Sequence, residues 1–240
     1  MELSIILPVF EERQKIARDI QAASEFLTSQ RWAGEIIVVD DGSRDDTAAV
    51  ARSVEVAPNI KLQVIRYDQN MGKGFAVRTG IEAAQGEYIM FADSGLCVPY
   101  ANVLRGWHWL KNGVCEIAHG SRKLTASKIQ RPQTWYRRMT GGIFRWVIFH
   151  WMKMPAHLTD TQCGFKIYRG EIAHELYREC KTNGFMFDVE IILRAARQGY
   201  RIKEFPIEWT CDRDSRLLRS RSARQILREL KDIKRALLQE

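Results

Sequence analysis

The amino-acid sequence predicts an α/β protein built around one mostly parallel sheet. Short β-branched runs alternate with segments of helical apolar spacing through the first hundred residues. Carboxylates follow two of these runs directly: Asp40 and Asp41 come after residues 36–39, and Asp93 ends the run 87–93. Open α/β sheets bind their ligands at the carboxyl ends of the strands. We therefore expect these acids to lie together at one edge of the sheet.

The individual elements follow from the residue pattern in chain order. Four successive β-branched residues at 36–39 fit a strand that is covered on both faces. Pro8 is expected to close the first strand, and Gly86 is expected to end a helix. The expected strands cover residues 3–7, 36–39, 61–65, 87–93, 114–119, 160–169 and 200–209. The expected helices contain residues 16–27, 48–54, 77–84, 104–110, 188–198 and 222–239.

Length and composition indicate one globular domain. The chain has 240 residues, of which 45% are hydrophobic and 28% charged. No apolar run approaches the roughly eighteen residues of a membrane span, and no basic region followed by an apolar run opens the sequence. The five cysteines lack the paired spacings of a zinc site or a disulfide framework. These features predict a cytoplasmic protein with reduced thiols and no transmembrane span.

The net charge of +8 is concentrated in residues 121–153 and 213–235. Such basic regions suit nucleic acid, phospholipid headgroups or a phosphorylated substrate, but no nucleic-acid recognition motif accompanies them. The aromatic and basic segment 135–151 fits either a core helix or a helix at a membrane interface. Residues 219–240 form a basic amphipathic pattern, so we expect a C-terminal helix appended to a domain of residues 1–218.

Neither of two common nucleotide-binding loops is present. The first strand-to-helix turn lacks G-x-G-x-x-G, and Gly72-Lys73-Gly74 does not match G-x-x-x-x-G-K-[ST]. A dinucleotide site and a Walker loop are therefore disfavoured.

Seven other motifs occur in an order typical of one enzyme family. They are Leu7-Pro8-Val9-Phe10-Glu11, Val39-Asp40-Asp41-Gly42-Ser43, Asn70-Met71-Gly72-Lys73-Gly74, the run from Gly86 to Asp93, Gly120-Ser121-Arg122, the run from Asp160 to Lys166, and Phe187-Asp188-Val189-Glu190. On these motifs nearly the whole chain resembles the inverting family 2 glycosyltransferases of the single-domain GT-A fold. Within that family it resembles the polyprenyl-phosphate branch of dolichyl-phosphate glucosyltransferases and mannose synthases. The last two motifs are more similar to the glucosyl members.

The resemblance implies a role for each matching residue. Those implied to hold or lie near the nucleotide are Pro8, Glu11, Asp40, Asp41 and Lys73. Those implied to act near the donor sugar, the acceptor or the leaving diphosphate are Asp93, Asp160, Gln162, Asp188, Arg122 and Arg213. Asp93 would also contact a divalent cation, Mg²⁺ or Mn²⁺, that bridges the diphosphate.

The chain departs from the family at the cation motif. Relatives normally carry Asp-x-Asp there, whereas this sequence has Asp93-Ser94-Gly95 followed by Leu96 and Cys97. Hard cations prefer oxygen ligands, so the loss of the second carboxylate weakens a metal site held by the protein.

The resemblance implies transfer of a hexose from a nucleotide diphosphate sugar to a polyprenyl phosphate at the cytoplasmic face of a membrane. UDP-glucose is the favoured donor and GDP-mannose the alternative. A phosphate acceptor is mostly ionised at neutral pH, with a second pKa of about 6, and needs no strong general base. For a hydroxyl acceptor, Asp188 would be the candidate base. The other interpretation is a non-catalytic nucleotide-sugar-binding or membrane-scaffold protein with a degraded metal motif. Nothing in the sequence indicates an oligomeric state.

Overall fold

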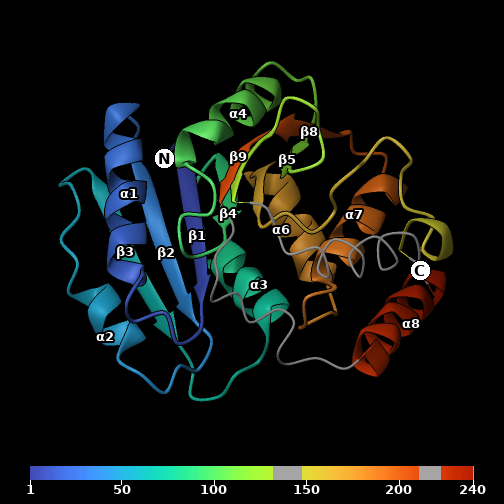
Figure 1. Ribbon diagram of the computed structural model, residues 1–240, viewed down its shortest axis with the longest axis horizontal. Helices are drawn as coiled ribbons and strands as arrows, with labels where there is room; N and C mark the ends of the chain where they lie inside the picture. Colours follow the sequence, from blue (N-terminus) through green and yellow to red (C-terminus); the bar gives the residue numbers. More distant parts are fainter. Residues whose placement is uncertain (132–147, 211–222, 240) are drawn as a thin grey trace.

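A seven-stranded sheet forms the centre of the protein (Figure 1). The computed structural model describes residues 1–131, 148–210 and 223–239. The strands of this sheet are β1 (Leu3–Val9), β2 (Gly34–Asp40), β3 (Ile60–Arg66), β4 (Tyr88–Ala92), β5 (Ile117–Ser121), β7 (Phe165–Arg169) and β8 (Ile202–Pro206). Their order is β3-β2-β1-β4-β7-β5-β8, and only β7 runs antiparallel to its neighbours. The predicted mostly parallel α/β sheet is confirmed.

Helices cover both faces of the sheet. The helices are α1 (Ile16–Ser29), α2 (Thr47–Arg52), α3 (Lys73–Ala83), α4 (Val103–Lys111), α6 (Gly170–Glu179), α7 (Phe187–Arg197) and α8 (Ala223–Gln239). Buried side chains of α1, α2 and α4 join one apolar cluster, and those of α3, α6, α7 and α8 join the other. In β2, Ile37 and Val39 face the second cluster while Ile36 and Val38 face the first, as the two-residue period of a strand requires.

Two strands differ from their predicted bounds. Pro8 lies inside β1 instead of ending it. At Pro8 the strand is paired with β2 alone, because its register with β4 stops at Ile6, and a proline is tolerated on an unpaired strand edge. β5 begins at Ile117 and not at residue 114, because Val114 still belongs to the turn that follows α4 and its N–H donates to Trp109 O.

The region after residue 160 differs more. Only Phe165–Arg169 of the expected strand 160–169 is extended in the sheet, and the unpredicted helix α6 follows it at once. The expected strand 200–209 is two strands, because the chain leaves the main sheet after Pro206. Its second part, β9 (Glu208–Thr210), pairs with β6 (Lys128–Arg131) in a small separate sheet.

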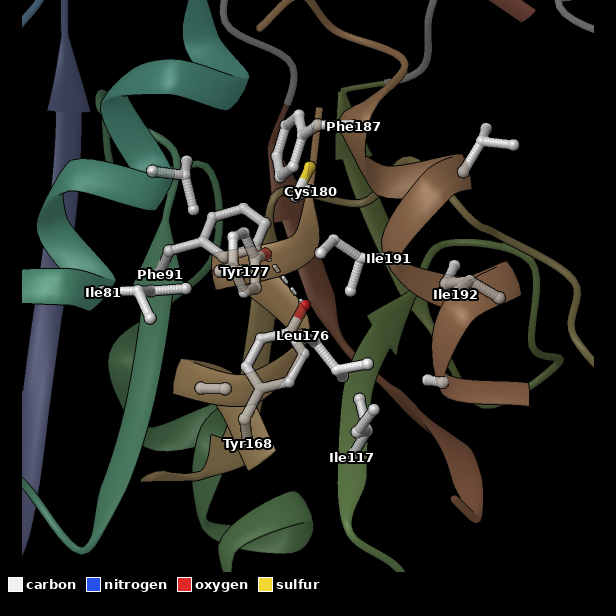
Figure 2. Close-up of a cluster of buried hydrophobic side chains, with 14 of the residues drawn as sticks. Ile81, Phe91, Ile117, Tyr168, Leu176, Tyr177, Cys180, Phe187, Ile191 and Ile192 are labelled. Carbon is white, nitrogen blue, oxygen red and sulfur yellow. Dashed lines mark hydrogen bonds between the residues drawn. The ribbon is translucent and has the colours of Figure 1, made fainter. Parts of the chain in front are cut away.

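Helix α6 packs on β7 through a pair of tyrosines. Figure 2 shows the hydroxyl groups of Tyr168 and Tyr177 meeting inside the apolar cluster, where they lie 3.2 Å apart and share a hydrogen bond. Their rings cross edge to face, and Tyr177 also contacts Phe187 of α7. This hydrogen bond satisfies two buried polar groups and fixes α6 against the strand that brings part of the site into place.

The C-terminal helix α8 packs on the domain through its apolar face. Leu230, Ile233 and Leu237 are buried in the cluster beneath α7, and Figure 1 places α8 beside α7, far from β3. Lys234 Nζ lies 5.3 Å from the ring centre of Trp151, which is partly buried against the same cluster.

The aromatic segment 135–151 is described only from residue 148 onward. Ile148 is buried, and Phe149 and Trp151 pack against the core cluster, which agrees with the core-helix interpretation for this end of the segment. The remainder, residues 135–147, lies outside the described residues. Among the described helices, none is long and apolar enough to cross a membrane.

Replacing Leu230 by alanine tests the packing of α8. Leu230 is fully buried, so Leu230→Ala is expected to lower the free energy of unfolding by about 2 to 5 kcal/mol. Leu238 on the same helix is 73% exposed, so Leu238→Ala is the matched control. It should change the free energy of unfolding by less than about 0.5 kcal/mol. Urea unfolding followed by circular dichroism measures both. Equal effects would contradict the observed packing.

Candidate active site

The functional residues gather where β2, β4 and β5 end. Because β7 runs antiparallel between β4 and β5, its beginning lies at the same edge of the sheet as their carboxyl ends. Asp93 follows β4, and its N–H donates to the carbonyl of Gly164, which precedes β7, at 2.8 Å. This arrangement brings residues 160–164 beside Asp93 and Arg122, although about forty to seventy residues separate them in the sequence.

Asp93 is paired with a lysine. Lys73 Nζ, from the first residue of α3, lies 2.5 Å from Asp93 Oδ1. The Asp93 side chain is 36% exposed and that of Lys73 15%. A Cβ atom on Gly164 would lie 2.0 to 2.2 Å from the Asp93 carboxylate, so only glycine at position 164 lets the carboxylate occupy this place. The sequence placed Lys73 in a nucleotide loop and Asp93 at a cation site, and the structure joins them.

Asp188 is also paired with a lysine. Its Oδ1 atom accepts a hydrogen bond from Lys166 Nζ at 2.5 Å, and both side chains are almost completely buried. Lys166 Nζ also donates to the carbonyl of Cys163 at 2.8 Å. Burial raises the pKa of Asp188, while the ammonium groups of Lys166 and Lys73 oppose this shift. The pair fixes the beginning of α7 to β7.

Arg122 and Asp160 form the third pair. The Nε and Nη2 atoms of Arg122 donate to the two carboxylate oxygens of Asp160 at 2.6 and 2.7 Å. Burial acts to raise the pKa of Asp160, but the guanidinium outweighs this effect and leaves that pKa below its usual value. Glu204 of β8 holds the same loop, since it accepts hydrogen bonds from the backbone of Thr159 and Asp160 at 2.8 and 2.7 Å.

The predicted nucleotide residues lie at the ends of β1 and β2. Asp41 accepts hydrogen bonds from the N–H groups of Met71 and Gly72, at 2.7 and 3.0 Å, and so connects β2 to the loop before α3. Burial raises the pKa of Asp41. The structure therefore shows Asp41 organising the loop that carries Lys73.

Asp40 and its neighbours lie beside that loop. Asp40 is buried, with Oδ1 accepting from Ser43 N at 2.9 Å and Oδ2 lying 3.6 Å from Arg66 Nε. Glu11 has a φ of +52°, and its N–H donates to Ser43 Oγ at 2.7 Å. Pro8 is buried in β1 opposite Val39, the residue before Asp40. The residues predicted to hold the nucleotide therefore lie close together, at the ends of β1 and β2 and in the loop before α3.

Gln162 and Arg213 are the two remaining predicted residues. Gln162 lies in the loop between Asp160 and Gly164, and its Nε2 is 3.6 Å from Met186 Sδ. Arg213 is outside the described residues.

Sequence reasoning missed Asp19, which supports the loop after Asp93. This residue of α1 is 1% exposed, and its Oδ2 accepts a hydrogen bond from Gly95 N at 2.5 Å. Burial raises the pKa of Asp19 to about 6, although Gly95 N–H and Arg18 oppose the shift. Sequence reasoning also missed Lys166 as the partner of Asp188 and Glu204 as the partner of the Asp160 backbone. Lys166 carried a signal, because it lies within a family motif, whereas Asp19 and Glu204 gave none.

The side chains around Asp93 do not fit a divalent cation held by the protein. No group of three His, Cys, Asp or Glu side chains with suitable geometry occurs among residues 1–131, 148–210 and 223–239. Asp93 supplies one carboxylate that already contacts an ammonium group, and Gly95 supplies no side chain. Mg²⁺ and Mn²⁺ favour several oxygen ligands. The described residues therefore offer no metal-binding group around Asp93, and the predicted cation is not confirmed.

Asp19 predicts a pH-dependent stability. Its pKa of about 6 in the folded protein exceeds the unfolded value near 3.9, so the folded state holds the proton more tightly and loses stability as the pH rises from about 4 to 6. Asp19→Asn removes this titration and keeps an oxygen acceptor for Gly95 N–H. The variant should match the wild type near pH 3 and be more stable by about 3 kcal/mol at pH 7.

Urea unfolding between pH 3 and 7 measures this difference. Asp68→Asn, at a side chain 98% exposed, is the control and should change stability by less than about 0.5 kcal/mol throughout. A difference between Asp19→Asn and the wild type that stays constant with pH would contradict the assignment.

Comparison with solved structures supports the same fold. Glucosyl-3-phosphoglycerate synthase from Mycobacterium tuberculosis, crystallised with UDP and Mn²⁺, superposes with a TM-score of 0.65 at 16% identity, over 99% of this chain and 79% of that one. It was also crystallised with Mg²⁺ and UDP. Mannosyl-3-phosphoglycerate synthase from Rubrobacter xylanophilus superposes with a TM-score of 0.66 at 17% identity, over 98% and 72% of the two chains. These neighbours have the GT-A type of fold that the sequence predicted.

Sequence comparison identifies the family. Dolichyl-phosphate beta-glucosyltransferases from Saccharomyces cerevisiae and Dictyostelium discoideum are 31% and 29% identical, over 86% and 87% of this chain. These two matches span 66% of each relative's length. Glycosyltransferase AglD of Haloferax volcanii is 27% identical over 90% of this chain, and that match spans 34% of its length. The profile of the family described as glycosyl transferase family 2 matches residues 4–176. The chain therefore belongs to glycosyl transferase family 2.

Proposed function

We propose that this protein transfers glucose from UDP-glucose to a polyprenyl phosphate of the dolichyl type, with inversion at the anomeric carbon. The observation that carries the proposal is the similarity to dolichyl-phosphate beta-glucosyltransferases, which extends over 86% or more of this chain. The site supports the proposal because it lies at one edge of the sheet. The ends of β2, β4 and β5, the loop before β7 and the beginnings of α3 and α7 meet there. A nucleotide sugar has a base, a diphosphate and a sugar, and each needs its own contacts at such an edge.

The engagement of Asp188 favours a phosphate acceptor over a hydroxyl acceptor. A hydroxyl needs a base within hydrogen-bond reach of its proton, and Asp188 is buried and bound to Lys166 at 2.5 Å. A phosphate monoester carries its negative charge already at neutral pH, since its second pKa is about 6. Asp188 then positions Lys166 and the beginning of α7, and no proton has to be removed.

The proposed reaction is a single displacement. An oxygen of the acceptor phosphate forms a bond to the anomeric carbon of glucose. The bond from that carbon to the diphosphate breaks, and its electron pair leaves on the nucleoside diphosphate. The chain must orient the two reactants in line and stabilise the charge that develops on the leaving group. Lys73 and Arg122 are the cations that lie around Asp93 for this purpose.

A product assay tests the proposal. Purified protein is incubated with short-chain polyprenyl phosphate and radiolabelled UDP-glucose, with GDP-mannose and other nucleotide sugars in parallel. We expect a lipid-linked glucose from UDP-glucose. Gly164→Ala should lower the rate by about 100-fold or more, because its Cβ would displace the Asp93 carboxylate. Lipid-linked mannose alone would shift the donor to GDP-mannose, and no lipid-linked sugar from any donor would refute the proposal.

We further propose that the protein works at the cytoplasmic surface of a membrane, with α8 as one contact. The apolar side of α8 packs on the domain, so the side available to lipid is the outer one. Its exposed basic residues are Arg224, Arg228, Lys231 and Arg235. Leu227 and Leu238, which are 45% and 73% exposed, add apolar surface. Anionic lipid attracts each such charge by about 1 kcal/mol near the surface.

Vesicle flotation tests this contact. We expect binding to vesicles of phosphatidylcholine and phosphatidylserine at low salt, and weaker binding as salt screens the charges. Arg228→Glu with Lys231→Glu should lower the affinity by about tenfold or more. The control is Arg52→Glu with Lys61→Glu, which makes the same charge change at exposed positions of α2 and β3 and should leave binding nearly unchanged. A protein that stays unbound at low salt would contradict the proposal.

A further inference from the structure

We propose that the ammonium group of Lys73, held by Asp93, takes the place of a divalent cation in binding the donor diphosphate, so that donor binding needs no metal ion. The inference rests on the proposed function for the identity of the donor. Four observations on the site support it, and each concerns residues that the structure describes.

The first observation is where the ammonium group lies. Lys73 Nζ contacts Asp93 Oδ1 at 2.5 Å, so a cation of the chain already lies against this carboxylate. An ammonium group has three N–H donors, and an ion pair with one carboxylate oxygen leaves at least two of them for other acceptors. The Lys73 side chain is 15% exposed. The remaining donors can bind diphosphate oxygens while Asp93 keeps the group in place.

The second observation is what else surrounds the ammonium group of Lys73. Its Nζ lies 5.9 Å from the ring centre of Phe91 and 5.8 Å from that of Phe185, and the faces of aromatic rings attract a cation. Two rings therefore hold this ammonium group in place together with the Asp93 carboxylate.

The third observation is the loop that replaces Asp-x-Asp. Gly95 has a φ of +92°, which an aspartate at this position would adopt only with strain, and its N–H is bound to Asp19 at 2.5 Å. Leu96 follows with a φ of +49°. The backbone after Asp93 is thus fastened to α1, and an aspartate at position 95 would add backbone strain in this conformation.

The fourth observation is the charge balance around Asp93. Asp93, Asp160 and Asp188 are paired with Lys73, Arg122 and Lys166, so these three carboxylates and three cations cancel. A divalent cation is attracted to a site with excess negative charge, and this set offers none. Of the three cations, Lys73 and Arg122 have side chains that are 15% and 24% exposed, so these two can contact a diphosphate.

Calorimetric titration with UDP, after treatment of the protein with EDTA, tests the inference. Wild-type affinity in EDTA should lie within about twofold of that in Mn²⁺. Lys73→Met should weaken UDP binding in EDTA by about 10- to 100-fold, the loss of a charge-assisted hydrogen bond, and Lys73→Arg should recover most of it. Lys61→Met, at an exposed lysine of β3, is the control and should bind UDP normally. Thermal unfolding checks that each variant is folded.

The outcomes separate this inference from the proposed function. An affinity for UDP that falls tenfold or more in EDTA, or a Lys73→Met variant that binds like the wild type, overturns the role of Lys73, while glucose transfer in Mn²⁺ would still support the proposed reaction. Metal-independent binding that depends on Lys73, without any lipid-linked product, supports the inference and refutes the acceptor. No binding of UDP under either condition refutes both.

Discussion

The pairing of buried charges at the strand ends is the constraint on which the site depends. Lys166 and Asp188 are almost inaccessible to solvent, and Asp160 is nearly so. A charge in such a place is tolerated only with a partner of opposite sign and further hydrogen bonds, and removal of one partner typically costs about 3 to 5 kcal/mol. Each pair joins segments that are distant in the sequence. The pairs therefore hold the loop at 160–164 and the beginnings of α3 and α7 at one edge of the sheet.

The antiparallel strand β7 makes this pairing possible. A parallel strand in its place would put residues 160–164 at the opposite end of the sheet, away from Asp93 and Arg122. Its insertion between β4 and β5 instead brings an amino-terminal end to an edge of carboxyl ends. The close contact of Gly164 with Asp93 and the hydrogen bond from Asp93 N to Gly164 O both follow from this reversal.

Much of the first half of the fold could be predicted from the sequence, because local pattern determines it. The run at 36–39 is fully buried in β2, and Asp40, Asp41 and Asp93 lie at strand ends as expected. The second half was harder. Helix α6 begins at Gly170, directly after β7, so no loop separates the two elements, and β9 leaves the sheet at a point that only tertiary contacts define.

The site shows the same division between local and distant information. Motifs identified which residues carry charge, and ten of the predicted positions lie within the described residues of the site or its supporting loops. Motifs could not identify the partner of each charge, because Lys73 with Asp93 and Arg122 with Asp160 depend on strand order. The support of Gly95 by Asp19 depends on the packing of α1 against the loop after β4, which leaves no trace in either segment alone.

The amphipathic tail illustrates a further limit of sequence patterns. An apolar stripe predicts that a helix buries one side, but it does not say against what. In α8 the stripe packs beneath α7, which leaves a basic outer side with two exposed leucines. The same helix can therefore stabilise the domain through one side and attract an anionic surface through the other. An acceptor with a long isoprenoid chain stays in the bilayer, because exposing each CH₂ to water costs about 0.8 kcal/mol. Under the proposed function the sheet edge has to reach the lipid, and a charged helix fixed to the domain is a means of holding it there.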